Sequence, residues 1–81
     1  MTSLPIEWRG SLIGLVHDVR ADNFHIYGRW EQTAESIADF LQEIDAQGEA
    51  AVLLGRSPKI ACVVVQPPHE FLELRRDTSR G

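Results

Sequence analysis

Two histidines and their polar neighbours have the side-chain types and spacing that come closest to acid–base chemistry. Asp18 directly follows His17, and further along the chain His25 alternates with other polar or aromatic residues. A histidine beside a carboxylate can act as a general base. If the two segments form a hairpin, their polar side chains share one face, which could bind a small molecule. The residues of that face are Asp18, His25, Tyr27 and Arg29. Because exposed ion pairs are frequent and weak, a surface pair between Asp18 and His25 is the simpler interpretation.

The remaining reactive side chains form no catalytic or metal-binding motif. The single cysteine, Cys62, lies in the apolar run 60–65, where a thiol packs as a small hydrophobic group. Structural zinc usually takes four ligands that include closely spaced Cys or His pairs. The three histidines (His17, His25 and His69) lack that spacing. We therefore predict no catalytic residue, no metal and no cofactor, and we expect that the protein is not an enzyme.

The charge of the chain is acidic and unevenly distributed. The formal net charge is −4, which argues against nucleic acid and anionic membranes as partners, because phosphate binding generally uses a basic surface. Every charged residue between Trp30 and Arg56 is acidic. These residues are Glu31, Glu35, Asp39, Glu43, Asp45 and Glu49. This segment is therefore the strongest functional signal in the sequence.

A helix through this segment would collect several carboxylates on one face. Glu35, Asp39 and Glu43 are four residues apart, so they fall within one narrow sector of a helix. Like charges at that spacing destabilise a helix slightly, and Asp45 near its C-terminus opposes the helix dipole. We predict that Glu35, Asp39, Glu43 and Asp45 form a docking face for a basic protein partner. A solvated face that keeps the protein soluble is the alternative interpretation.

The apolar pattern predicts that this helix spans residues 34–47. Thr33 is a suitable N-cap, and Gly48 stands where a left-handed C-terminal cap is favoured. The apolar stripe at three- and four-residue spacing consists of Ala34, Ile37, Ala38, Leu41 and Ile44, with Phe40 beside it.

Residues 11–19 and 24–30 have the composition and alternation of two strands, which we pair as a hairpin through a loop at 20–23. This register gathers the apolar side chains on one face and places His17 among them, opposite Ile26. A slip of one residue would scatter the apolar set over both faces, so we prefer this pairing.

Glycine interrupts both strands of this hairpin, at Gly14 and Gly28. Glycine inside a strand weakens it and often marks a bulge or a close approach of another element to the backbone. We expect one of these features there.

Three further strands are expected, at residues 50–55, 60–66 and 70–76. The second is apolar from Ile60 to Val65, which is typical of a central strand covered on both faces or nearly so. The third alternates and carries charge, so we place it at the edge of the sheet; a short helix is the alternative for these residues. The predicted fold is a two-layer α+β domain, in which one amphipathic helix packs on a small, mostly antiparallel sheet in the order ββαβββ.

The 81 residues suffice for one domain, which we expect to span 1–81 with an N-terminal arm at 1–9 and a frayed tail at 77–81. No secretory signal and no membrane-spanning apolar run is visible, and we expect a cytoplasmic protein. The leading functional hypothesis is a non-catalytic interaction or regulatory module with a basic protein partner and an exposed sheet edge that permits a homodimer. The alternative is a small-molecule binding protein or minor enzyme that uses the hairpin face.

Overall fold

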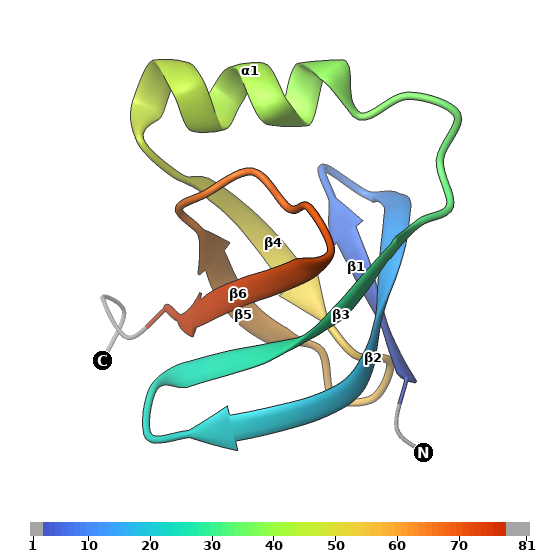
Figure 1. Ribbon diagram of the computed structural model, residues 1–81, viewed down its shortest axis with the longest axis vertical. Coiled ribbons are helices and arrows are strands. Elements are labelled where there is room, and N and C mark those ends of the chain that lie inside the picture. Colours follow the sequence, from blue (N-terminus) through green and yellow to red (C-terminus); the bar gives the residue numbers. More distant parts are fainter. Residues whose placement is uncertain (1–2, 78–81) are drawn as a thin grey trace.

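The chain folds into a closed antiparallel barrel of six strands with one short helix across its end (Figure 1). The computed structural model describes residues 3–77. The strands are β1 (Ser3–Trp8), β2 (Ser11–Asp22), β3 (His25–Gln32), β4 (Ala50–Leu54), β5 (Ile60–Val64) and β6 (Phe71–Arg76), and helix α1 (Ala38–Gln47) connects β3 to β4. Around the barrel the strands follow the order β1-β2-β3-β6-β5-β4. The predicted two-layer α+β fold is therefore wrong.

Strand β1 is the element that closes the barrel, and it is formed by residues that were expected to be an arm. One side of β1 pairs with β2, and the other pairs with β4 through Ile6 opposite Leu54 and Glu7 opposite Leu53. Pro5 interrupts the alternation of this segment, and because proline is unfavourable inside strands the sequence did not predict a strand here. Once β1 is present, the sheet has partners for both of its outer strands and curls into a barrel.

Strand β6 matches the predicted strand at 70–76 in sequence but not in position. Leu72 and Leu74 point into the core as expected, yet β6 lies between β3 and β5 instead of at an edge. A closed barrel has no edge strand, so the expected route to a homodimer through a sheet edge loses its basis. Residues 78–81 of the predicted tail at 77–81 lie outside the described residues.

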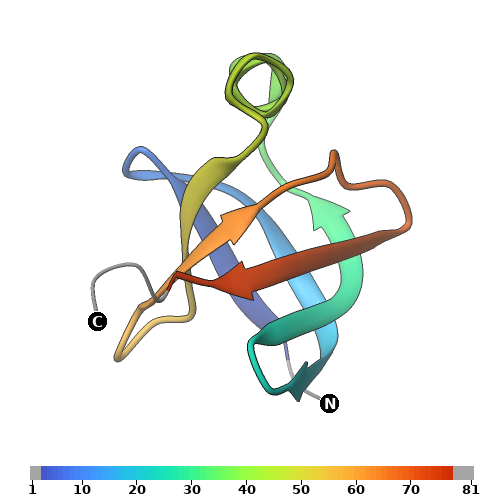
Figure 2. The ribbon, with the colours of Figure 1, turned by 90° about the vertical axis from the view of Figure 1, so that its left-hand side faces the viewer.

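The barrel interior is filled by inward-facing side chains from all six strands, which alternate along each strand except at the β2 irregularity between Leu12 and Gly14. They are Ile6, Ile13, Val16, Ile26, Val52, Leu54, Cys62, Val64, Leu72 and Leu74. Phe40 and Ile44 of α1 cover the end of this core and are almost completely buried. The helix thus closes one end of the barrel rather than lying over the face of an open sheet (Figure 2).

Helix α1 begins at Ala38, four residues later than predicted. Its N-cap is Ile37, which provides no side-chain hydrogen bond. The backbone amides of Thr33 and Ala34 instead donate to the carbonyl of Ile13, at 3.1 and 3.3 Å. These bonds hold the preceding segment against β2, so its amides are already satisfied and the helix starts after it. Thr33 is therefore not the N-cap.

The C-terminus of α1 agrees with the prediction. Gly48 has a left-handed φ of 81°, and its amide donates to the carbonyl of Ile44 at 2.8 Å. Glycine adopts this conformation without steric cost, which makes it the preferred C-terminal cap.

The β2–β3 hairpin has a different register from the predicted one. Asp22 pairs with His25, so the turn is shorter than expected and contains Asn23 at a φ of 54°. The ladder then shifts between His17 and Arg20, where Asp18 also has a φ of 54°. This bulge turns His17 to the outside of the barrel, and the prediction that His17 lies on the apolar face is wrong.

The two hairpin glycines do mark close approaches. A Cβ atom at Gly14 would collide with the ring of Trp30, and one at Gly28 would lie 2.5 Å from the carbonyl oxygen of His17. At each position a neighbouring group lies so close to the backbone that a side chain would not fit, as the sequence predicted.

Candidate functional site

An open groove runs between the β1–β2 turn and helix α1. Its cavity has a volume of about 670 Å³. The lining residues, which together we call the α1 groove, are Trp8, Arg9, Asp39, Gln42, Glu43, Ala46 and Gln47. Arg9 and Gly10 make the turn, at φ values of 52° and 81°, and Trp8 pairs with Ser11 across it. This tight turn lies at the same end of the barrel as α1 (Figures 1 and 2).

Trp8 forms the floor of the groove and is anchored from two sides. Its ring meets the ring of Phe40 edge-on, with centroids 5.8 Å apart and an interplanar angle of 71°. Its indole Nε1 donates to Glu43 Oε2 at 3.4 Å. Because Phe40 belongs to the core, the position of the indole is determined by the packing of α1 on the barrel.

Arg9 lies over this floor. Its guanidinium carbon is 4.9 Å from the centroid of a Trp8 ring, and Nη2 donates to Glu43 Oε1 at 2.6 Å. The Arg9 side chain is 72% exposed, whereas that of Glu43 is 20% exposed. The groove therefore already holds one guanidinium, by a cation–π contact and an ion pair together.

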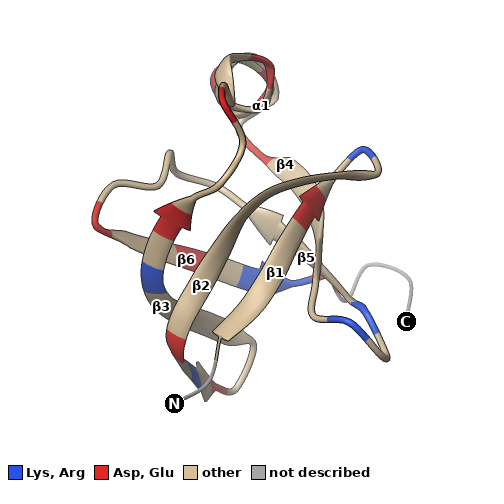
Figure 3. Ribbon diagram, turned by 90° about the vertical axis from the view of Figure 1, so that its right-hand side faces the viewer, with Lys and Arg blue, Asp and Glu red and all other residues tan. Residues whose placement is uncertain are grey.

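The six acidic residues between Trp30 and Arg56, which are red with the other acidic residues in Figure 3, divide into two groups by their contacts. Three contact side chains of other elements: Glu43 pairs with Arg9, Glu49 pairs with Arg75, and Glu31 contacts the imidazole of His17. The other three are exposed and make no ion pair with any residue in the described range 3–77; they are Glu35, Asp39 and Asp45. The negative charge of this region is thus partly neutralised by contacts that sequence spacing did not reveal.

Only part of the predicted docking face is gathered in one place. Asp39 and Glu43 are one helical turn apart and both line the α1 groove. Glu35 precedes the helix, and Asp45 follows Asp39 by six residues, which places it about 240° around the helix axis. The structure adds Trp8 and Arg9 to the site. The signal for them was the Arg-Gly pair after Trp8, which is typical of a tight turn.

The predicted hairpin face is divided into separate ion pairs. Arg29 donates to Asp18 at 3.1 Å, and His25 lies 3.2 Å from Glu73 on β6. Asp18 and His25 are not paired with each other, because the short turn places His25 opposite Asp22. The sequence could not show that Glu73 is the neighbour of His25, since the pairing of β3 with β6 joins distant segments.

Tyr27 of that predicted face lines a cavity. Its volume is about 280 Å³, and its other lining residues are Gln66, Pro67, Phe71, Leu72 and Glu73. Tyr27 is 43% exposed and Phe71 is 62% exposed, so the outer surface of β3 and β6 carries two aromatic rings.

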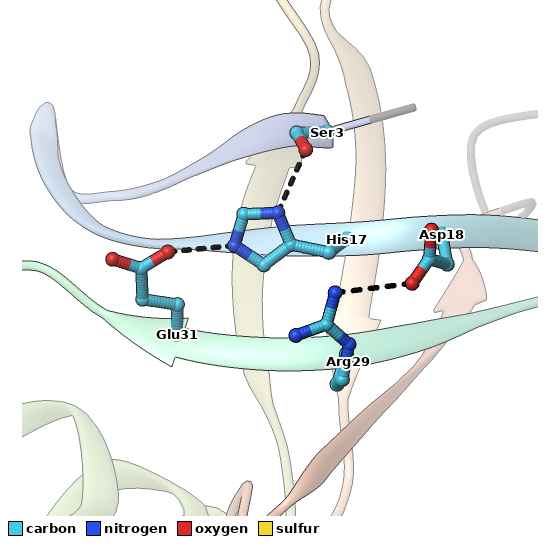
Figure 4. A network of polar contacts seen from close by, with 5 residues as sticks. All are labelled: Ser3, His17, Asp18, Arg29 and Glu31. Carbon is cyan, nitrogen blue, oxygen red and sulfur yellow. Dashed lines mark hydrogen bonds and ion pairs between the residues drawn. The ribbon is translucent and has the colours of Figure 1, made fainter. Parts of the chain in front are cut away.

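A chain of polar contacts crosses the outer surface of β1, β2 and β3 (Figure 4). Ser3 Oγ lies 2.7 Å from His17 Nδ1, and His17 Nε2 lies 2.6 Å from Glu31 Oε1. A hydroxyl, an imidazole and a carboxylate in series also occur in nucleophilic catalysis, where they work beside an oxyanion-binding donor and a substrate pocket. None of the cavities described above is lined by these three residues. Their contacts join three neighbouring strands.

Cys62 is buried in the barrel. Burial raises the pKa of its thiol to about 11, an effect that the nearby Arg76 reduces and Asp77 increases. The thiol is therefore protonated near neutral pH, which confirms the interpretation of Cys62 as a small hydrophobic group.

Among residues 3–77, no three or more His, Cys, Asp or Glu side chains are grouped as a metal ion would require. The one helix in this part of the chain is too short and too polar to cross a membrane. In comparisons with known proteins, no family model, no curated protein and no solved structure matches this chain.

Proposed function

We propose that this protein is a non-catalytic interaction module that docks a basic segment of a partner protein in the α1 groove. The observation that carries the proposal is the charge of α1 and its flanks. Six acidic residues and no basic residue occur between Trp30 and Arg56, and three of the six carboxylates stay unpaired within the described chain. Asp39, one of the unpaired three, lies directly on the groove.

Only part of this charge serves the helix itself: Asp39 lies in the first turn of α1, where a carboxylate complements the helix dipole. The last turn of α1 contains no basic residue, although a cation there would complement the helix dipole. Asp45 near that end opposes the dipole. Negative charge that costs helix stability and faces solvent is consistent with a surface that attracts a cationic partner and accelerates its association.

The groove also offers contacts beyond charge. Trp8 provides an aromatic surface, and Gln42 and Gln47 provide amide groups that donate and accept hydrogen bonds. Aromatic residues frequently supply much of the binding free energy at interfaces. A basic segment that lies along α1 would therefore meet both an electrostatic and a packing surface.

The hairpin face supports the alternative function less well. Asp18 and Arg29 satisfy each other, and His25 is paired with Glu73. Tyr27 borders a cavity on the outer surface of β3 and β6. A ligand there would have to break existing ion pairs to use these groups.

The proposal is tested with two variants that remove the same charge from different places. Asp39→Asn changes the groove, and Asp22→Asn changes an exposed position at the far hairpin turn. The probe is a peptide of about ten residues that alternates arginine with alanine, titrated by calorimetry at low and at physiological salt. We expect Asp39→Asn to weaken binding about fivefold and Asp22→Asn to leave it nearly unchanged. Equal weakening by both variants would mean that net charge alone attracts the peptide, and would refute the proposal.

The Asp45→Asn variant measures how far the contact extends. Asp45 lies on the other flank of α1, so a segment confined to the groove binds this variant as it binds the wild type. A loss equal to that of Asp39→Asn would place the peptide across the exposed top of the helix and outside the groove.

A further inference from the structure

We propose that Trp8 and Glu43 form a receptor for a single arginine side chain of the partner, and that Arg9 occupies this receptor in the free protein. The inference rests on the proposed function, because it concerns how the same groove recognises a basic segment. It adds the chemical identity of the recognised group and an internal competitor for it.

The geometry of Arg9 shows what the receptor selects. The guanidinium carbon lies 4.9 Å from the Trp8 ring centroid, while Nη2 contacts Glu43 Oε1 at 2.6 Å. A planar guanidinium stacks on an indole and pairs with a carboxylate at the same time, whereas the compact ammonium of lysine has no planar face to stack. The receptor should therefore favour arginine over lysine.

The receptor is held in place without help from Arg9. Trp8 packs edge-on against the buried Phe40, and its Nε1 donates to the same Glu43 carboxylate. Glu43 belongs to α1 and is only 20% exposed. Removal of the Arg9 side chain would thus leave the indole and the carboxylate where they are, facing an open groove.

Arg9 itself is held only at its tip. It belongs to a two-residue turn, its side chain is 72% exposed, and its φ of 52° is unfavourable for a residue with a Cβ atom. The turn would be better served by asparagine or glycine. Arginine differs from asparagine or glycine at this position by its side-chain contacts with Trp8 and Glu43.

A partner's arginine has one contact available that Arg9 does not use. Asp39 lies one helical turn before Glu43, lines the same groove and makes no ion pair with a residue in the described range. Side chains at that spacing have Cβ atoms roughly 5–6 Å apart, so one guanidinium is able to approach both carboxylates. Exchange of Arg9 for an incoming arginine is therefore favoured by the second carboxylate.

The test uses blocked arginine amide as the probe, with blocked citrulline amide and blocked lysine amide as comparisons. Citrulline keeps the planar shape and lacks the charge. Binding is followed by the Trp8 indole N–H resonance, which the Trp30→Phe variant distinguishes from that of Trp30. Two variants empty the receptor: Arg9→Gly, which suits the positive φ, and Arg9→Gln, which keeps most of the side-chain length. Arg56→Gln, in the β4–β5 loop at the opposite end of the barrel, removes the same charge as a control (Figure 3).

We expect both Arg9 variants to bind arginine about fivefold more tightly than the wild type and the Arg56→Gln control. Lysine should bind more weakly than arginine, and citrulline should not shift the Trp8 resonance. An unchanged arginine affinity in both Arg9 variants, no shift with arginine in any protein, or equal binding of citrulline would each overturn the inference.

The two proposals fail in different ways. If the basic peptide binds in a manner that depends on Asp39 while the Arg9 variants gain nothing, the docking module stands and the arginine receptor is refuted. If the peptide binds Asp39→Asn and Asp22→Asn equally, the docking module is refuted, whatever the Arg9 variants do.

Discussion

The guanidinium of Arg9 and the carboxylate of Glu43 meet at 2.6 Å although the residues are 34 positions apart in sequence. Their ion pair fastens the tip of the first hairpin to the helix that closes the barrel. Glu43 also accepts a hydrogen bond from the Trp8 indole, so one carboxylate positions both Trp8 and Arg9 in the α1 groove.

This ion pair should be measurable by a double-mutant cycle with Arg9→Gln and Glu43→Gln. We expect a coupling free energy of about 0.5–1 kcal/mol, because Arg9 is largely exposed and such pairs are weakened by solvent. Urea unfolding of the four proteins provides the measurement. A coupling near zero would show that the two side chains do not hold each other in solution.

The control for that cycle is the ion pair between Lys59, in the β4–β5 loop, and Glu7 of β1, at 2.8 Å. Its coupling should be similar in size, but it should leave the fluorescence of Trp8 unchanged. Only the cycle at Arg9 and Glu43 is expected to alter that signal.

Substitution of Gly14 should damage the barrel more than substitution of Gly48. A Cβ at Gly14 meets the Trp30 ring and the backbone oxygen of Glu31, so we expect Gly14→Ala to lower the free energy of unfolding by about 1–3 kcal/mol. Gly48→Ala meets nothing within 4 Å and should cost only about 1 kcal/mol, from its positive φ. Thermal unfolding of both variants makes the comparison, and an equal loss would contradict the packing argument.

The contacts of Ser3, His17 and Glu31 should stabilise the protein and carry no acyl-transfer chemistry. We expect Ser3→Ala and Glu31→Ala each to lower the free energy of unfolding by about 0.5–1.5 kcal/mol, because each removes one short hydrogen bond to the imidazole. Chemical denaturation measures these losses. Covalent labelling of Ser3 by a serine-directed fluorophosphonate would contradict this assignment.

Alkaline pH should destabilise the fold through Cys62. Burial raises the pKa of its thiol from 9.0 to about 11, so the folded protein retains a proton that the unfolded chain releases. Below pH 9 both states are protonated and the thiol contributes no pH dependence; between about pH 9 and 11 the stability of the folded state should fall. The difference between wild type and Cys62→Ala in melting temperature isolates this effect, since other titrating groups are common to both. A difference that stays constant from pH 8 to 11 would refute it.

Local periodicity was sufficient to locate most elements. Leu72 and Leu74 alternate with exposed residues, and this pattern alone predicted the inward face of β6. Gly48 likewise predicted the end of α1. In both cases the relevant interaction lies within a few residues of the signal, so a single sequence contains it.

The topology and the groove depend on pairings between distant segments. The partners of β6 are β3 and β5, and nothing in the residues 71–76 identifies them. Because of Pro5 the sequence did not predict β1, which closes the barrel by pairing with both β2 and β4. Glu43 was predicted to belong to an acidic face, but its neighbours Trp8 and Arg9 come from the β1–β2 hairpin, which the sequence did not predict.

The short β1–β4 ladder links the groove to the integrity of the barrel. The two backbone pairs, Ile6 with Leu54 and Glu7 with Leu53, are immediately followed in sequence by Trp8. A ladder this short is where a barrel opens most readily, so its amides should exchange with solvent sooner than those of the long β2–β3 ladder. Any molecule that immobilises Trp8 would then also slow deuterium uptake at Leu53 and Leu54. Binding in the groove would therefore be detectable as slower opening of the paired strand β4.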